Sequence, residues 1–234
     1  MSGQRRSLQS LFQSFVNAIS PSRTKRRAKQ AMISESLEQR ILPSGVDLLK
    51  DINPNSQFQG INPTALTVVG NRVFFVATTA EGTELWVSDG TEQGTQQVRD
   101  IALGAASSNP QDLINFNGIL YFTAENGTNG RELWRSDGTS SGTQIVRDIQ
   151  PGMGTSKPRN FAVAGKVMYF SASDGVVGEE LWKTDGTYSG TVRVKDINAG
   201  TTSSAPRSIT TVGNSVFFVA TDAATGSELW ISDG

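Results

Sequence analysis

Four tryptophans occur in the chain, at positions 86, 134, 182 and 230, and each lies 48 residues after the one before. Every one of them stands in the motif Glu-Leu-Trp-x-x-Asp-Gly. A period of this length is typical of tandem units that each form one supersecondary structure and bury their apolar faces by stacking on their neighbours. The repeated structural positions are Glu84, Leu85, Trp86, Asp89, Gly90, Glu132, Leu133, Trp134, Asp137, Gly138, Glu180, Leu181, Trp182, Asp185, Gly186, Glu228, Leu229, Trp230, Asp233 and Gly234.

Each unit contains four short runs with the composition of β-strands. In the first copy they cover residues 65–69, 72–78, 84–88 and 96–101, and Gly70 marks the tight turn between the first two. No segment from residue 46 onward has helical periodicity. Four strands per unit at this period predict an all-β fold, a β-propeller with one four-stranded blade for each repeat.

The third run of each unit indicates how the blades pack. Leu85 and Trp86 are neighbours on this run, so their side chains point to opposite faces of the strand. A strand with a fixed apolar residue on each face belongs between two other sheets. We therefore expect the leucine to pack against one neighbouring blade and the tryptophan against the other.

The Asp-Gly step predicts a turn between the third and fourth runs. With symmetric pairing about this turn, the motif glutamate opposes a cation on the fourth run, and three copies repeat this pair. A cross-strand pair of this kind contributes about 0.2–1 kcal/mol and mainly fixes the register. The predicted cross-strand cations are Arg99, Arg147 and Lys195, opposite Glu84, Glu132 and Glu180.

The two ends of the repeat region carry complementary pieces of a blade. The fourth copy stops at Gly234, before its fourth run, and residues 46–52 have the pattern of that missing run. One interpretation is that this N-terminal strand completes the last blade and closes a ring of four. The other is an open part of a larger propeller. Either way, residues 46–234 form the repeat domain and residues 1–45 a separate arm.

The composition excludes several kinds of chemistry. Cysteine and histidine are both absent, so thiolate nucleophiles, histidine bases and Cys/His zinc sites are excluded. The acids recur with the repeat, and none stands out as a catalytic pair. Calcium is the ion that the Asp-Gly loops could hold, but they lack the dense Asp-x-Asp-x-Asp pattern of a dedicated site. We therefore assign no catalytic, cofactor-binding or metal-binding residue, and expect no enzyme.

The arm differs in charge from the repeat domain. Residues 1–40 hold eight Lys or Arg against two acids, a net charge of +6, while the rest of the chain carries −7. Residues 8–19 have the apolar spacing of an amphipathic helix, and basic residues flank it. Such a segment predicts contact of residues 5–29 with a membrane surface or an export machinery. A disordered arm without a partner is the alternative, and we expect no nucleic-acid ligand.

The four motif copies over residues 46–234 resemble the ELWxxDGT repeats of large surface and exported proteins of planctomycetes and other bacteria. Residues 37–40, Leu-Glu-Gln-Arg, are similar to the Leu-Glu-Pro-Arg export motif of planctomycete proteins, with Gln39 in place of proline. The resemblance implies an exported, cell-surface or extracellular location. Our expectation is a non-catalytic propeller scaffold for binding or adhesion to a protein, glycan or other polymer. The alternatives are the propeller of a carbohydrate-active enzyme and a purely structural spacer.

Overall fold

The structure is a computed structural model that describes residues 46, 48–53 and 60–234. The chain divides into two compact units, Met1–Leu48 and Leu49–Gly234. The predicted arm, with its helix at 8–19 and its contact segment at 5–29, lies outside the described residues. The described part is all-β and contains no helix, and so none that could cross a membrane. The all-β prediction is therefore confirmed.

The strands form four antiparallel sheets, one for each repeat. The first contains β1 (Thr64–Val69), β2 (Arg72–Thr79), β3 (Gly82–Ser88) and β4 (Gln96–Gln97). The second contains β5 (Gln111–Phe116), β6 (Ile119–Ala124), β7 (Glu132–Ser136) and β8 (Gln144–Arg147). The third contains β9 (Arg159–Ala164), β10 (Val167–Ser173), β11 (Glu179–Thr184) and β12 (Val192–Lys195). The fourth contains β13 (Arg207–Val212), β14 (Ser215–Asp222) and β15 (Gly226–Ser232).

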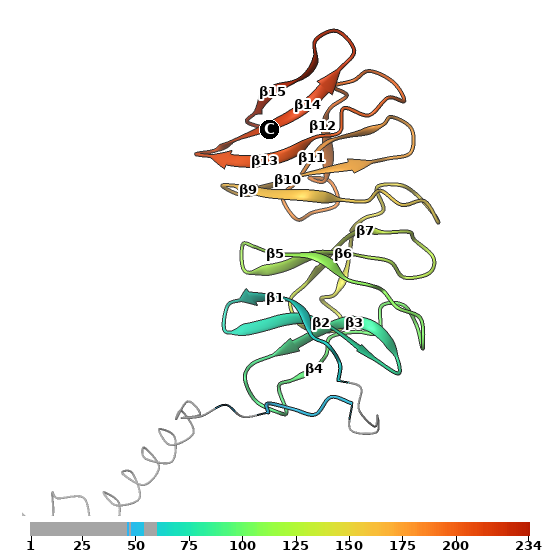
Figure 1. Cartoon of the computed structure of the whole chain (residues 1–234), viewed down its shortest axis with the longest axis vertical. Helices are drawn as coiled ribbons and strands as arrows, with labels where there is room; N and C mark the ends of the chain where they lie inside the picture. The colour runs from blue at the N-terminus through green and yellow to red at the C-terminus, as the bar shows by residue number, and fades with distance from the viewer. Residues whose placement is uncertain (1–45, 47, 54–59) are drawn as a thin grey trace, which may run out of the picture. The chain divides into compact units, whose positions relative to one another are not determined.

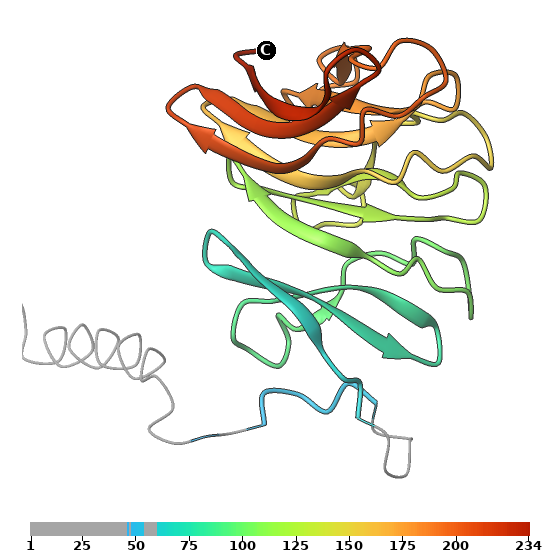
Figure 2. The ribbon, with the colours of Figure 1, turned by 45° about the horizontal axis from the view of Figure 1, so that its top comes forward.

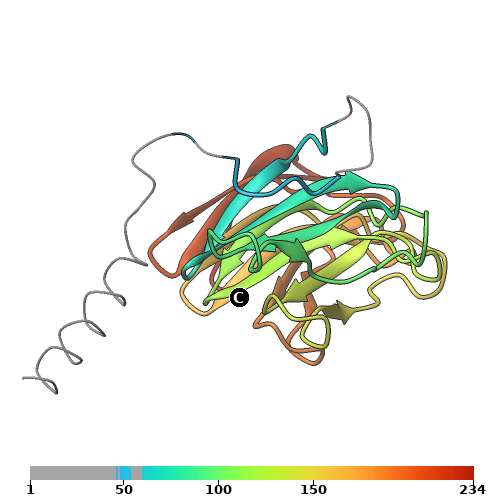
Figure 3. The same ribbon diagram turned by 90° about the horizontal axis from the view of Figure 1, so that it is seen from below.

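The sheets follow one another in chain order, with the first and the fourth at opposite ends of the series (Figures 1 and 2). Seen from below, they overlie one another (Figure 3). The first strands of successive sheets are neighbours, and Asn115 Nδ2, for example, donates to Val68 O at 3.1 Å. The arrangement is that of successive propeller blades, but the described residues do not close a ring. The fourth sheet has three strands, so its completion by residues 46–52 is not observed.

In the second and third motifs the leucine and the tryptophan pack against different neighbouring sheets, as predicted. Trp134 belongs to a core cluster with Phe74 and Leu85 of the first sheet. Leu133 belongs to the next cluster, with Met168 and Phe170 of the third sheet. Both side chains are almost wholly buried, because the second blade is covered on both faces.

The predicted pairing of glutamate with a cation is wrong. Beside the turn the register is as expected, since Arg135 opposes Gln144 and Trp134 opposes Ile145. A β-bulge follows, and Arg147 then opposes Leu133 instead of Glu132. The third sheet repeats this shift, with Lys195 opposite Leu181. The extra residue moves the cation to the other face of the sheet.

The first sheet departs from the predicted pair in its own way. Its fourth strand is only Gln96–Gln97, shorter than the predicted 96–101. The Arg99 guanidinium donates to Thr143 O in the second sheet, at 2.6 Å, and Arg147 donates to Thr191 O in the third at the same distance. The cations therefore join neighbouring blades and do not lock a hairpin.

Candidate functional site

The motif glutamates have a role within the fold that the pairing prediction missed. Glu132 is fully buried, and its carboxylate accepts bonds from Ile149 N (3.0 Å), Ser156 N (3.1 Å) and Ser156 Oγ (2.6 Å). Desolvation by burial raises the pKa of Glu132 to about 7, although these bonds lower it. Glu84, Glu132 and Glu180 each accept such bonds from the linker that leads into the next sheet. The equivalent serines are Ser108, Ser156 and Ser204.

The motif aspartates form the predicted turns. Asp137 Oδ1 accepts bonds from Thr139 N (2.9 Å) and Thr139 Oγ1 (2.7 Å), and these bonds lower the pKa of Asp137. Gly138 follows with a φ of 86°, a conformation that glycine adopts without strain. Asp89 and Asp185 make the same contacts with Thr91 and Thr187. The invariant residues of the first three copies therefore all serve the fold.

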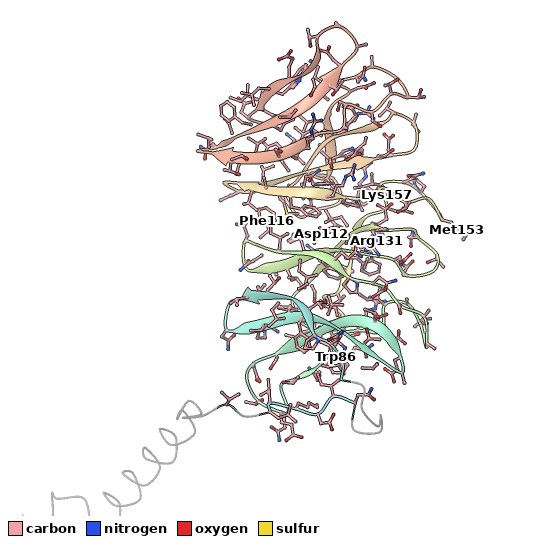
Figure 4. All side chains as sticks on the ribbon, viewed as in Figure 1. Trp86, Asp112, Phe116, Arg131, Met153 and Lys157 are labelled. Carbon is pink, nitrogen blue, oxygen red and sulfur yellow. The ribbon has the colours of Figure 1, made fainter. Side chains whose placement is uncertain are left out.

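A polar cleft lies between the second and third sheets, and we call it the blade 2–3 cleft. Its volume is about 500 Å³. Strand β5, the ends of β6 and β7, and the segment before β9 line it, and Figure 4 shows Asp112, Arg131 and Lys157 near one another there. The polar side chains that line it are those of Gln111, Asp112, Glu125, Arg131, Thr155, Lys157 and Arg159.

The backbone of the cleft is a repeated structure. Asp112 lies in the irregular part of β5 with a φ of 55°, and Lys157 precedes Pro158 with a φ of 48°. The equivalent positions of the other repeats are also left-handed: Asn62, Ala65, Asn109, Asn160, Ala205 and Ser208. Since every blade has this backbone, the cleft takes its particular chemistry from its side chains.

The charged groups of the cleft are held in different ways. Arg131 Nη1 donates to Asn109 O at 2.8 Å, and Arg131 Nη2 lies 3.4 Å from Glu125 Oε1. Arg159 makes a two-bond pair with Glu179, at 2.9 and 2.5 Å. The ammonium of Lys157 is exposed and makes no hydrogen bond or ion pair among the described contacts. It is therefore the cation of the cleft that is available to a ligand.

Two positions of each blade differ in charge and size between the repeats, and we call them the rim positions. One is the first residue of the first strand of each sheet, which is Thr64, Gln111, Arg159 or Arg207. The other is the residue before the motif glutamate, which is Thr83, Arg131, Glu179 or Ser227. The contacts differ accordingly: Thr78 with Thr83, Arg131 with Glu125, Arg159 with Glu179, and Arg207 with Ser227. Sequence reasoning missed the cleft because it looked for chemistry in the repeated residues. The positions at which the aligned repeats carry different residues would have indicated it.

The arrangement suits reversible polar binding. The acids whose pKa values burial raises, Glu84 and Glu132, are inside the fold, where a substrate has no access to them. No group of three or more Asp or Glu side chains within residues 46, 48–53 and 60–234 could hold a metal ion. The cleft offers paired ions, an amide and one unpaired ammonium, which together can bind hydroxyl and carboxylate groups.

No family model matches the sequence, and no curated protein does. Among solved structures, the chain is similar to puromycin hydrolase in a complex with PGG, at 19% identity and a TM-score of 0.51 over 73% of this chain. It is also similar to a prolyl endopeptidase (12%, TM-score 0.41, 70% of this chain and 25% of that one). An α-L-arabinofuranosidase from Clostridium thermocellum overlaps at 16% identity and a TM-score of 0.35, over 74% of this chain and 68% of its own. The chain spans about a quarter of puromycin hydrolase, 27%. The likeness to puromycin hydrolase concerns the fold, and no activity follows from it.

Proposed function

We propose that the repeat domain is a non-catalytic binding scaffold whose blade 2–3 cleft takes an acidic glycan. One observation carries the proposal: the invariant residues serve the fold, while the rim positions, on an almost identical backbone, vary in charge and size. Variable side chains on a constant backbone are the usual means by which repeat proteins present a binding surface.

The chemistry of the cleft supports a glycan over a protein partner. Protein interfaces depend on buried aromatic and arginine anchors. No Phe, Tyr or Trp lines this cleft, and Arg131 and Arg159 are already paired with acids. Gln111 and Asp112 can bind hydroxyl groups, and the Lys157 ammonium can bind a carboxylate. The resemblance to ELWxxDGT surface proteins supports an exported or cell-surface location, where such polymers occur.

The test is calorimetric titration of the full chain with oligogalacturonate, and with a neutral oligosaccharide of similar length. We expect the acidic oligomer to bind and Lys157→Ala to weaken its binding roughly ten- to hundredfold, the value of a charge-assisted hydrogen bond. Lys166→Ala is the matched control, since this exposed lysine lies in the β9–β10 turn of the same blade and outside the cleft. Equal binding by both variants would contradict the assignment of the cleft.

The same mixtures test the enzyme alternative. If the chain only binds, oligogalacturonate keeps its length distribution during prolonged incubation. Shortened products that disappear in Asp112→Asn or Glu125→Gln would show catalysis at the cleft and refute a purely binding role.

A further inference from the structure

The outer face of the fourth sheet is apolar and uncovered. Leu229 is 70% exposed and Ile231 61%, whereas Leu133 is 0% and Val87 3% exposed at equivalent positions. In the first three repeats, the next sheet covers these positions. Strand β15 also has no partner on its second edge among the described residues. The β13–β15 sheet therefore exposes a strand edge and an apolar face of the kind that a further strand and the next sheet cover in the first three repeats.

A hollow of about 350 Å³ adjoins this edge. Val194, Lys195, Phe218, Trp230 and Ile231 are among the residues that line it. In the other repeats the cation equivalent to Lys195 donates to a carbonyl at the start of the next fourth strand, as Arg147 does to Thr191 O at 2.6 Å. Lys195 lies instead over the Trp230 ring, 5.7 Å from its centroid. The hollow therefore lies beside the edge at which a fourth strand would pair with β15.

The first sheet carries a segment of the matching kind. Lys50 Nζ donates to Thr95 O at 2.8 Å, as Arg99 donates to Thr143 O one repeat later. Ile52 packs against Phe75 and Trp86 of the first sheet. Its counterparts Ile101 and Ile149 lie in the clusters that join the first sheet to the second and the second to the third. Residues 49–53 thus contact the first sheet in the manner of a fourth strand from a preceding blade.

We propose that a second copy of this chain docks end to end, and that its residues 49–52 become the fourth strand of the β13–β15 sheet. Two copies can donate this strand to each other across a two-fold axis. This exchange pairs the free edge of β15 in each copy. By the register of the complete sheets, Leu229 of one copy opposes Lys50 of the other, as Leu133 opposes Arg147.

The junction differs from the internal ones in one contact. At the position of Ser108, Ser156 and Ser204 the first repeat has Ile61. Glu228 of one copy would then accept bonds from the backbone N–H groups of Ile52 and Ile61 of the other, but none from a hydroxyl. The docking is accordingly weaker than the internal contacts, and Ile61→Ser is expected to strengthen it.

The experiment uses the absence of cysteine in the chain, because introduced thiols are then unique. Full-length Leu229→Cys and Lys50→Cys are purified separately, mixed and oxidised mildly. A disulfide between the two variants can form only between copies, so a covalent heterodimer above the level of either variant alone is expected. No heterodimer would overturn the proposal, as would a double variant that crosslinks only within single chains.

Mass in solution gives an independent measurement. Light scattering of the full chain should give twice the monomer mass at high concentration, and Leu229→Asp should weaken self-association at least about tenfold, since it places a charge in an apolar contact. Leu103→Asp is the control, because Leu103 is 82% exposed and lies outside this face. A monomer at every concentration, or equal weakening by both variants, would refute the docking surface. Neither result depends on binding at the blade 2–3 cleft.

Discussion

The second and the fourth copies of the motif have the same residues in different surroundings. Leu133 is fully buried and Glu132 accepts bonds from the linker to the third sheet, while Leu229 is 70% exposed and Glu228 is exposed. Both copies lie on the third strand of a regular antiparallel sheet. The motif therefore forms its own hairpin, but the next blade determines whether its leucine and glutamate contribute to stability.

This difference places the stability of the repeat domain at the junctions. A buried leucine gains its transfer free energy from the neighbouring sheet, and a buried carboxylate is tolerated only where donors meet it. The four copies consequently provide matched pairs in which one substitution is made at a closed and at an open junction.

The largest effect is expected for the leucine pair. Leu133→Ala should lower the free energy of unfolding by about 2–5 kcal/mol, because it leaves a cavity between the second and third sheets. Leu229→Ala should change it by less than about 0.5 kcal/mol when protein concentrations are low enough to prevent association. Denaturant unfolding followed by tryptophan fluorescence measures both. Equal losses would mean that the fourth sheet is covered in solution.

The glutamate pair should show the next largest difference. In Glu132→Gln the amide NH₂ faces backbone N–H donors, so the free energy of unfolding should fall by about 1–3 kcal/mol. Glu228→Gln should leave it nearly unchanged, since that side chain is exposed. Ser156→Ala removes a single hydroxyl donor to Glu132 and should cause a smaller loss than Glu132→Gln. A Glu228 variant as unstable as the Glu132 variant would contradict the comparison.

The dependence on pH should distinguish the same two sites. The pKa of Glu132 is about 7 in the folded state, against 4.5 as its ordinary value, so the folded chain binds the proton more tightly. The free energy of unfolding should therefore fall as the pH rises from about 4.5 to 7. Glu132→Gln should flatten this slope relative to Glu228→Gln. An unchanged slope would show that another group causes it.

The sequence predicted the parts of the fold that depend on local periodicity. The strand runs, the Asp-Gly turns and the opposite faces of leucine and tryptophan follow from alternation and turn chemistry within one repeat. The bulges before Arg147 and Lys195 were not predictable by symmetric counting, and they moved both cations to the other face of their sheets. The partners of Glu132 lie in the linker and the next repeat, although a serine 24 residues after each of the first three motif glutamates is visible in the sequence. The cleft was missed because its side chains do not repeat.

The smallest effect concerns the cations. Arg147 donates to Thr191 O in the third sheet at 2.6 Å, and its guanidinium lies 5.0 Å from the ring centre of Tyr188. Arg147→Ala should therefore lower the free energy of unfolding by about 1 kcal/mol. Lys195→Ala should cost less, about 0.5 kcal/mol, since its ammonium lies over the Trp230 ring of the fourth sheet but makes no hydrogen bond to that sheet among the described contacts. Because the bond joins two blades, Arg147→Ala should also increase amide exchange in β8 and β12 together. Were the cation a partner of Glu132, as the sequence predicted, only β7 and β8 would respond, and a Glu132→Gln, Arg147→Ala double variant would show coupling between the two side chains.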